Sequence, residues 1–257
     1  MSLSVRNLCV EFMGFEKNFA AVKGVSFDVN KNEVFAVVGE SGSGKSAVAL
    51  SVTGLHNKNF TRVSGEIFFA GKNLLNLSER ELVKIRGKEI AVILQDPTTA
   101  LNPLIRVGKQ IEEPLLYHTN FSAAARKAHT LELLNAVGIT NPRRVYCALP
   151  HELSGGMCQR VVIAAALACD PAVLIADEPT TALDVTNQAQ ILDLLRTLQK
   201  NFHTAIILIT HDLGVVAETA HRVAVMHAGQ IVETTDVRSL FKNPCHPYTR
   251  RLLAAMP

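Results

Sequence analysis

The feature that most constrains the fold is a glycine-rich loop near the start of the chain. Gly39-Glu40-Ser41-Gly42-Ser43-Gly44-Lys45-Ser46 has the form G-x-x-x-x-G-K-[ST]. The apolar, β-branched run before it, Val34-Phe35-Ala36-Val37-Val38, predicts a buried strand. The residues after it, Ala47 to Val52, continue as a helix would. A strand, this loop and a helix in succession predict a P-loop nucleotide site rather than an ordinary Gly/Ser turn.

The chemistry of phosphate binding explains the residue types in this loop. Glycines let the backbone curl, so that successive N–H groups converge on phosphate oxygens in front of the positive end of the helix. The Lys45 ammonium can reach the β- and γ-phosphates, and the Ser46 hydroxyl can ligate Mg²⁺. Because many reactions use such a loop, it does not by itself indicate which one occurs.

The composition describes an apolar-cored chain without membrane or nucleic-acid signals. Its 257 residues suit one domain, or one domain with a large insertion, and 48% of them are hydrophobic. A net charge of +3 is too small to indicate nucleic-acid binding. The longest apolar stretch, Val161 to Cys169, is far short of the roughly 20 residues of a membrane span, and the first residues lack a signal-peptide core. Five cysteines without C-x-x-C spacing predict reduced thiols in a cytosolic protein.

Hydrophobic patterning divides the chain into strand-rich and helix-rich parts. The expected strands are 4–12, 24–29, 65–72 with Gly at both ends, 90–94, 172–176 and 205–209, followed by a hairpin of 222–226 and 229–233. A capping box, Ser78 with Glu81, predicts a helix through residue 86. From 98 to 159 the pattern becomes helical, with helices at 107–116 and 122–137. Apolar strands alternating with helices predict a parallel sheet covered on both faces.

Two acids follow one of these strands. Val173-Leu174-Ile175-Ala176 is followed by Asp177 and Glu178. In a P-loop fold the carboxyl end of such a strand opens beside the phosphates, so Asp177 can hold Mg²⁺ and Glu178 can orient and deprotonate an attacking water. The alternative is a strand that ends in a solvated acidic turn.

A second glycine-rich turn lies before a helix. Leu153-Ser154-Gly155-Gly156-Met157-Cys158-Gln159-Arg160 offers the Ser154 hydroxyl and backbone N–H groups to an anion. One chain does not need two phosphate cradles for one nucleotide, whereas two chains facing head to tail would use both.

In this order, the motifs resemble the nucleotide-binding subunit of an ATP-binding cassette (ABC) transporter over nearly the whole chain. The Walker A loop is 39–46, the signature is 153–159 with Met157-Cys158 where many members have Gln and a basic residue, and the Walker B strand is 173–177. Gln95 stands at the Q-loop position, Thr181-Ala182-Leu183-Asp184 at the D-loop, and His211 at the switch histidine.

The resemblance implies a fold and a division of the chain. The fold is an α/β P-loop NTPase (RecA-like) core with an antiparallel β subdomain and an inserted helical subdomain. The expected parts of this single ABC ATPase domain are 1–95 and 160–235 for the core with its β subdomain, 96–159 for the helical signature subdomain, and 236–257 for a C-terminal tail.

The resemblance also implies site residues, with ATP as substrate and Mg²⁺ as cofactor. The ATP-binding residues are Gly39, Ser41, Gly42, Ser43, Gly44, Lys45, Ser46 and Gln95. The catalytic residues are Glu178 and His211, and the Mg²⁺ ligands are Ser46, Gln95 and Asp177. A second subunit would contact Ser154, Gly155, Gly156, Gln159 and the D-loop Asp184. The candidates for stacking on the adenine are Phe12, Phe15 and Phe19. For each of them, packing in the core is an alternative of at least equal weight.

Three further segments resemble the peptide/nickel importer ATPases: Pro150 to Met157, Gln95-Asp96-Pro97 with Leu101-Asn102-Pro103, and His246-Pro247-Tyr248-Thr249. His221 and His227 depart from this group, which has Asp and Tyr there, and both are expected on the outer surface. Because the chain ends at Pro257, it is expected to lack the cysteine-bearing tail of many dipeptide members, as shorter nickel-type members do.

The implied function is ATP hydrolysis coupled to solute import, on the cytoplasmic side of the cell membrane. The implied partners are transmembrane permease subunits, a second ABC ATPase subunit, more often a different chain than a copy, and indirectly an extracytoplasmic solute-binding protein. The resemblance favours a peptide as the transported solute, followed by nickel or a metal chelate. The alternatives are an inactive subunit, which would lack Glu178 or His211, and a non-transport ATPase on DNA or ribosomes, which would carry long coiled coils or two cassettes.

Overall fold

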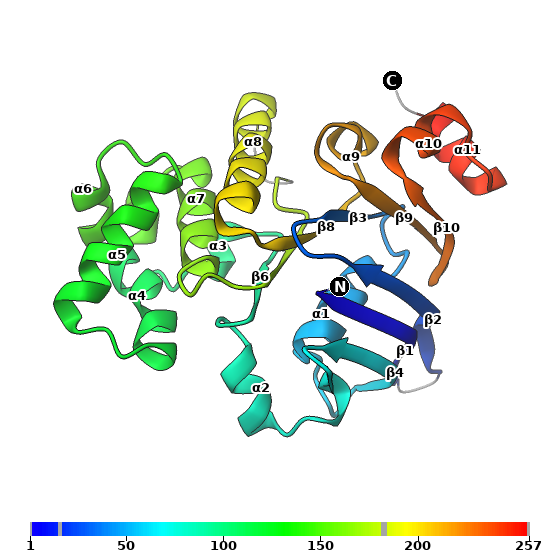
Figure 1. Cartoon of the computed structure of the whole chain (residues 1–257), viewed down its shortest axis with the longest axis horizontal. Coiled ribbons are helices and arrows are strands. Elements are labelled where there is room, and N and C mark those ends of the chain that lie inside the picture. Colours follow the sequence, from blue (N-terminus) through cyan, green and yellow to red (C-terminus); the bar gives the residue numbers. More distant parts are fainter. Residues whose placement is uncertain (1, 15–16, 181–183, 256–257) are drawn as a thin grey trace. The chain divides into compact units, whose positions relative to one another are not determined.

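The computed structural model of the chain describes residues 2–14, 17–180 and 184–255 (Figure 1). Contacts divide it into two units, one formed by Met1–Leu82 with Ala205–Pro257 and the other by Val83–Thr204. In the described part of the chain we find no helix with the length and apolar character that a membrane crossing requires.

The first unit contains a four-stranded antiparallel sheet. Its strand β1 (Leu3–Phe12) pairs with β2 (Phe19–Val29) and β4 (Thr61–Phe69), and β5 (Lys72–Asn73) continues the sheet beyond β4. Buried and more exposed positions alternate along the second half of β1, as expected for a strand with one face on the core. The antiparallel β subdomain that the resemblance implies is confirmed.

The predicted limits of one of these strands are wrong. The pattern predicts that Gly65 begins a strand, but β4 begins at Thr61 and Gly65 lies inside it with a φ of +105°. A Cβ added there would lie 2.5 Å from the carbonyl oxygen of Asn7, at a shift in the β1–β4 register. The glycine therefore serves a bulge and a close approach of two backbones, not a strand end.

The other sheet of this unit contains a fully buried strand, β3 (Val34–Val38). β3 lies between β8 (Ala205–Thr210) and β9 (Arg222–His227), and it is parallel to both. β10 (Gln230–Asp236) pairs antiparallel with β9, which confirms the predicted hairpin. All five β3 side chains are buried, which explains why the run has no polar alternation.

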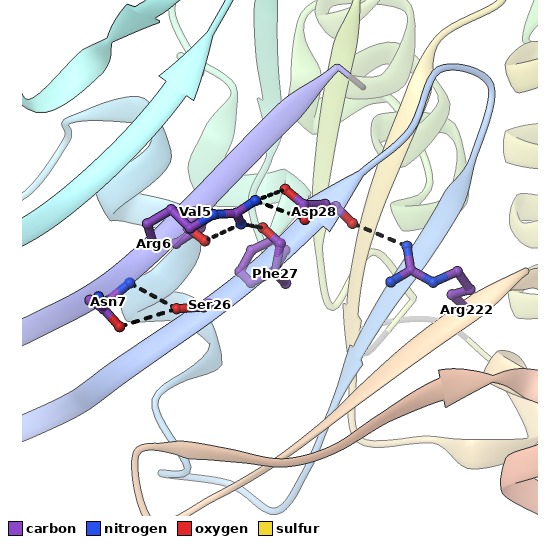
Figure 2. A network of polar contacts seen from close by, with 7 residues as sticks. All are labelled: Val5, Arg6, Asn7, Ser26, Phe27, Asp28 and Arg222. Carbon is purple, nitrogen blue, oxygen red and sulfur yellow. Dashed lines mark hydrogen bonds and ion pairs between the residues drawn. The ribbon is translucent and has the colours of Figure 1, made fainter.

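Arg222 attaches the end of β2 to the start of β9, as Figure 2 shows. Its Nη1 donates to the backbone oxygen of Asp28 at 3.2 Å and to Glu33 Oε1 at 3.1 Å. Arg6 Nη2 donates to both carboxylate oxygens of Asp28 at 2.7 and 2.9 Å (Figure 2). Burial raises the pKa of Asp28, but the hydrogen bonds from Arg6 and Ser4 and the charges of Arg6 and Arg222 together outweigh it, so the net pKa is lowered. Because the Arg6 and Asp28 side chains are more than a third exposed, this pair adds little to stability on its own.

Helices complete the first unit. α1 (Lys45–Thr53) follows β3, and η1 (Leu74–Asn76) and α2 (Glu79–Ile85) follow β5. Half of the predicted capping box is confirmed, since Glu81 Oε2 accepts the Ser78 N–H at 2.9 Å. The Ser78 hydroxyl donates to the same oxygen at 2.6 Å, and the Glu81 N–H binds the Ser78 backbone oxygen instead. The remaining helices, α9 (Leu213–Thr219), α10 (Val237–Lys242) and α11 (Pro247–Ala254), contribute side chains to one core with β3 and β9.

The second unit places helices around two parallel strands. β6 (Ile90–Ile93) pairs with β7 (Val173–Asp177). Between them in the chain come α3 (Pro97–Ala100), α4 (Val107–His118), α5 (Ala123–Ala136), α6 (Pro142–Cys147), η2 (Pro150–Glu152) and α7 (Gly155–Ala166), and α8 (Val185–Phe202) follows β7. The helices predicted between residues 98 and 159 are confirmed. All five cysteines are free.

Glu233 of β10 holds the chain that leads into α11. Its carboxylate accepts the N–H groups of Cys245 and His246, both at 2.9 Å. Burial raises the pKa of Glu233, but the hydrogen bonds outweigh it and the net pKa lies below the ordinary 4.5. The resulting stabilisation is therefore complete above pH 4.5 and disappears as the pH falls through the lowered pKa.

We accordingly expect Glu233→Gln to lower the thermal midpoint at pH 7, and its difference from the wild type to shrink as the pH falls below 4.5. Thermal unfolding followed by circular dichroism between pH 7 and pH 3 measures this. Glu66→Gln, on an exposed position of β4, is the matched control. A difference that stays constant across this pH range would contradict the assignment.

Candidate nucleotide site

The glycine-rich loop leaves the end of β3 and enters α1, which confirms the predicted strand, loop and helix. Gly42 and Gly44 have φ values of 79° and 103°, a region that side chains other than glycine rarely adopt. A Cβ on Gly44 would also collide with the backbone oxygen of Ala21. Gly44 caps α1 without any side-chain hydrogen bond, so the first N–H groups of the helix are not bound by a cap side chain and can bind an anion.

Lys45 is the buried cation of this loop. Its side chain is almost fully buried, and Nζ donates to the backbone oxygens of Gly39 at 2.7 Å and Glu40 at 2.8 Å. Nζ also lies 3.5 Å from Ser43 Oγ. Ser46, the next residue of α1, is exposed. The loop thus combines a lysine, open N–H groups and a hydroxyl, which together suit the phosphates of a nucleotide.

His211 lies at the same edge of the same sheet. The parallel register pairs Val38 with Thr210. The glycine-rich loop, which follows Val38, and His211, which follows Thr210, therefore begin next to each other. Asp212 fixes this turn, because its Oδ1 accepts the N–H groups of Gly214 at 2.7 Å and Val215 at 3.3 Å. Sequence reasoning missed this positioning role, although an Asp directly before an apolar helical run is a typical N-cap signal.

In the second unit, Gln95 and Glu178 are brought together. β6 and β7 run parallel with Ile93 opposite Ala176, so the residues that follow each strand meet at one edge. Gln95 Nε2 donates to Glu178 Oε2 at 3.1 Å. Asp177 is the last residue of β7 and is buried, and Glu178 is half-buried with a φ of 47°. A non-glycine residue in this left-handed region is uncommon and is concentrated at functional sites.

The second glycine-rich turn begins α7. Ser154 is the N-cap residue, and its Oγ accepts the Met157 N–H at 3.3 Å. A Cβ on Gly155 would meet open space, and one on Gly156 would lie 3.3 Å from Asn187 Oδ1. The turn therefore presents an exposed Ser154 hydroxyl and Gly155 backbone, whereas Gln159 is 1% exposed and lies inside the unit.

The D-loop and the aromatic candidates are only partly described. Residues 181–183 lie outside the described residues, and Asp184 caps α8 by accepting the Asn187 N–H at 3.0 Å. Phe15 also lies outside them. Phe12 and Phe19 are directly opposite each other in the β1–β2 register, with 36% and 61% of their surfaces exposed.

The expectation of an outer-surface position is wrong for His227. Its ring is half-buried and stacks on Tyr248, with centroids 3.9 Å apart. His221 is exposed as expected, although its Nδ1 also accepts the Val34 N–H at 3.0 Å. The sequence could not predict the stack, because the two rings come from β9 and α11.

Comparison with known proteins decides the family. Residues 22–181 match the family model described as ABC transporter. The chain belongs to the ABC transporter family. It is 55% identical to the oligopeptide transport ATP-binding protein OppD of Bacillus subtilis (strain 168), over 99% of this chain and 72% of that protein. It is 53% identical to the dipeptide transport ATP-binding protein DppD of Lactococcus lactis subsp. cremoris (strain MG1363), over 99% of this chain and 73% of that protein.

Solved structures agree with this membership. The ATP-binding cassette MJ0796, in a dimeric post-hydrolysis state bound to ADP and Pi, has a TM-score of 0.81 and 29% identity, covering 92% of this chain and 99% of that one. CbiO1 from Clostridium perfringens, part of the ABC transporter complex CbiONQ, has a TM-score of 0.78 and 26% identity, covering 99% of this chain and 95% of that one. The α/β ABC ATPase fold and the ATP-binding role predicted from the motifs are therefore confirmed.

Proposed function

We propose that this chain is the ATP-hydrolysing subunit of a peptide importer. The similar proteins OppD and DppD are named for oligopeptide and dipeptide transport, which favours peptide over nickel as the solute. The observation that carries hydrolysis, rather than nucleotide binding alone, is the Glu178 carboxylate held by Gln95 at the end of a buried strand. ATP turnover by the purified chain, alone and with its partner subunits, tests the proposal, and no turnover in either form would contradict it.

The P-loop residues would hold the triphosphate. The Lys45 ammonium, held against the Gly39 and Glu40 backbone oxygens, would also bind phosphate oxygens, where both partners of the hydrogen bond are charged. Backbone N–H groups of the loop would bind the remaining oxygens, and the open N-terminus of α1 would favour their negative charge. The residues we assign to this task are Gly39, Ser41, Gly42, Ser43, Gly44, Lys45 and Ser46.

The side chains assigned to Mg²⁺ fit it chemically. Ser46, Gln95 and Asp177 offer hydroxyl, amide and carboxylate oxygens, which are the hard ligands that Mg²⁺ prefers. Among the described residues there is no group of three or more His, Cys, Asp and Glu side chains that could bind a metal by itself, which agrees with an ion shared with the nucleotide. When bound, Mg²⁺ neutralises charge on the β- and γ-phosphates.

Glu178 would act as the general base on the attacking water. The Gln95 hydrogen bond to Oε2 orients the carboxylate, which would accept the proton of the water. His211, on the turn that Asp212 holds, would contact the γ-phosphate and help position that water. Gln95 would also sense the γ-phosphate and link the site to the permease.

The exposed turn at the start of α7 would complete the site of a second ATPase subunit. Ser154, Gly155 and Gly156 would bind the γ-phosphate held by the other subunit's P-loop, with Asp184 nearby in the same contact and Gln159 supporting α7 from inside. The partners would be a second ABC ATPase, permease subunits in the membrane and, through them, an extracytoplasmic solute-binding protein. The chain would then be peripheral on the cytoplasmic side.

Phe12 is the aromatic residue that we assign to the adenine. Its ring meets His56 edge to face with centroids 6.0 Å apart. His56 Nε2 is in turn 3.0 Å from the backbone oxygen of Ala47 in α1, the helix that begins at Lys45. Burial lowers the pKa of His56, so this ring is neutral at pH 7. Phe12 is thus held beside the P-loop helix, and an ordered ring costs less to use as a stacking platform.

We expect Phe12→Ala to weaken ATP binding roughly 5- to 100-fold, because stacking of a base on an aromatic ring contributes about 1–3 kcal/mol. Titration of the purified variants with a fluorescent ATP analogue measures this. Phe19→Ala, at the opposite position of β2, is the matched control and should change affinity less than Phe12→Ala. A larger loss in Phe19→Ala would reassign the platform to Phe19.

A further inference from the structure

The His246-Pro247-Tyr248-Thr249 segment has no role in the site derived so far, yet it reaches the P-loop within the first unit. Tyr248 lies in α11 and is 4% exposed. Its hydroxyl oxygen accepts the backbone N–H of Glu40, the second residue of the loop, at 3.4 Å. Burial raises the pKa of Tyr248, so the hydroxyl stays protonated and neutral near pH 7.

The peptide unit that Tyr248 contacts is the one that holds Lys45. The N–H of Glu40 and the C=O of Gly39 belong to one planar peptide group, in which they point to opposite sides when the bond is trans. No cis peptide bond occurs among the described residues. Tyr248 therefore binds the N–H at one edge of this peptide group, and the Lys45 ammonium binds the C=O at the opposite edge at 2.7 Å.

The Tyr248 ring is itself held from two directions. It stacks on His227 with centroids 3.9 Å apart and an interplanar angle of 27°. His246 Nδ1 accepts the Tyr248 N–H at 3.1 Å and so begins α11, while Glu233 binds the N–H of His246. The hydroxyl is thus presented to the loop from a position that β9, β10 and α11 fix together.

The same end of β9 also meets the loop directly. A Cβ on Gly39 would collide with the backbone oxygen of Met226, the residue before His227. The turn after β9 donates the Gly229 N–H to the backbone oxygen of Ser43 at 3.1 Å. The Gly39–Glu40 peptide is therefore enclosed by Met226 and Tyr248, and its orientation depends on both.

We propose that Tyr248 is a positioning residue for the P-loop, setting the peptide plane of Gly39–Glu40 from which Lys45 engages the nucleotide. This inference rests on the proposed function, since it assigns the residue to the same nucleotide site. The His-Pro-Tyr-Thr segment would then contribute to ATP binding. Its turn, which His246 caps, places the Tyr248 hydroxyl against the Glu40 amide of the loop.

The test is Tyr248→Phe, which keeps the ring and its stacking but removes the acceptor oxygen. We expect its dissociation constant for ATP to rise roughly 2- to 10-fold, the range for the loss of one hydrogen bond between neutral groups. Hydrogen exchange of the Glu40 amide should accelerate, with the effect confined to 39–41. The thermal midpoint without nucleotide should stay within about 2 °C of the wild type. His227→Ala should weaken ATP binding in the same direction, because it removes the stacking partner of the ring.

Tyr117→Phe makes the same chemical change on an exposed tyrosine of α4 and is the control. Unchanged affinity and unchanged Glu40 exchange in Tyr248→Phe would overturn the inference. Faster exchange throughout 205–255 with a matching fall in thermal midpoint would also overturn it, since Tyr248 would then be a general packing residue. If the wild-type chain itself did not bind ATP, the proposed function would fail together with this inference, whereas normal binding by both forms would remove the inference alone.

Discussion

Glu178→Gln is expected to lower the rate of ATP hydrolysis roughly 10²- to 10⁴-fold while ATP still binds, because it removes the carboxylate base and little else. The amide oxygen of the new side chain can still accept the Gln95 hydrogen bond that the structure records at 3.1 Å, so the geometry should be kept. Without turnover, the ATP-bound state should accumulate, and with it the dimer in which Ser154 of one subunit contacts the nucleotide of the other. Phosphate release in steady state and size-exclusion chromatography with ATP measure the two effects.

Glu113→Gln, on an exposed position of α4, makes the same exchange of carboxylate for amide and should hydrolyse ATP at the wild-type rate. Normal hydrolysis by Glu178→Gln would remove the assignment of Glu178 as the base. Loss of both hydrolysis and ATP binding would mean instead that Glu178 maintains the structure of the site.

Lys45→Ala is expected to weaken ATP binding at least roughly 10- to 100-fold, because a charge-assisted hydrogen bond to phosphate contributes about 1.5–3 kcal/mol. The buried ammonium also satisfies the backbone oxygens of Gly39 and Glu40, so some loss of stability without nucleotide should accompany the change. The informative measurement is the rise in thermal midpoint on adding ATP with Mg²⁺, which follows the ratio of ligand concentration to dissociation constant.

That rise should be largely lost in Lys45→Ala and kept in Lys31→Ala, which removes an exposed lysine from the turn before β3. Comparing each variant with and without nucleotide separates lost binding from lost stability. An ATP-induced rise equal to that of the wild type would contradict the P-loop assignment.

The P-loop and its flanking elements could be predicted because the relevant residues are contiguous. Phosphate binding requires glycines, Lys45 and Ser46 in a fixed order between a strand and a helix, and that order is visible in one stretch of sequence. The ends of β6 and β7 were predictable for a related reason, since buried parallel strands present their carboxyl ends at one edge. The Gln95–Glu178 hydrogen bond follows from that arrangement.

What the sequence could not predict depends on contacts between distant segments. The pattern predicts a strand end at Gly65, but its conformation allows the close approach of the Asn7 backbone on the neighbouring strand. The sequence predicts a surface position for His227, but its ring stacks on Tyr248. Tyr248 and Glu40 are 208 residues apart, so no local pattern could show that the C-terminal helix reaches the P-loop. Side-chain roles of this kind follow from packing rather than from motifs.

Peptide uptake by cells tests the central claim most directly, because it requires both the ATPase activity and the assigned solute. A strain lacking this chain is supplied with the wild type, Glu178→Gln or no copy, and uptake of a labelled oligopeptide and of radioactive nickel is measured in parallel. We predict that only the wild type restores peptide uptake and that nickel uptake is the same in all three strains. Peptide uptake that does not depend on the chain, or restoration of nickel uptake alone, would contradict the account.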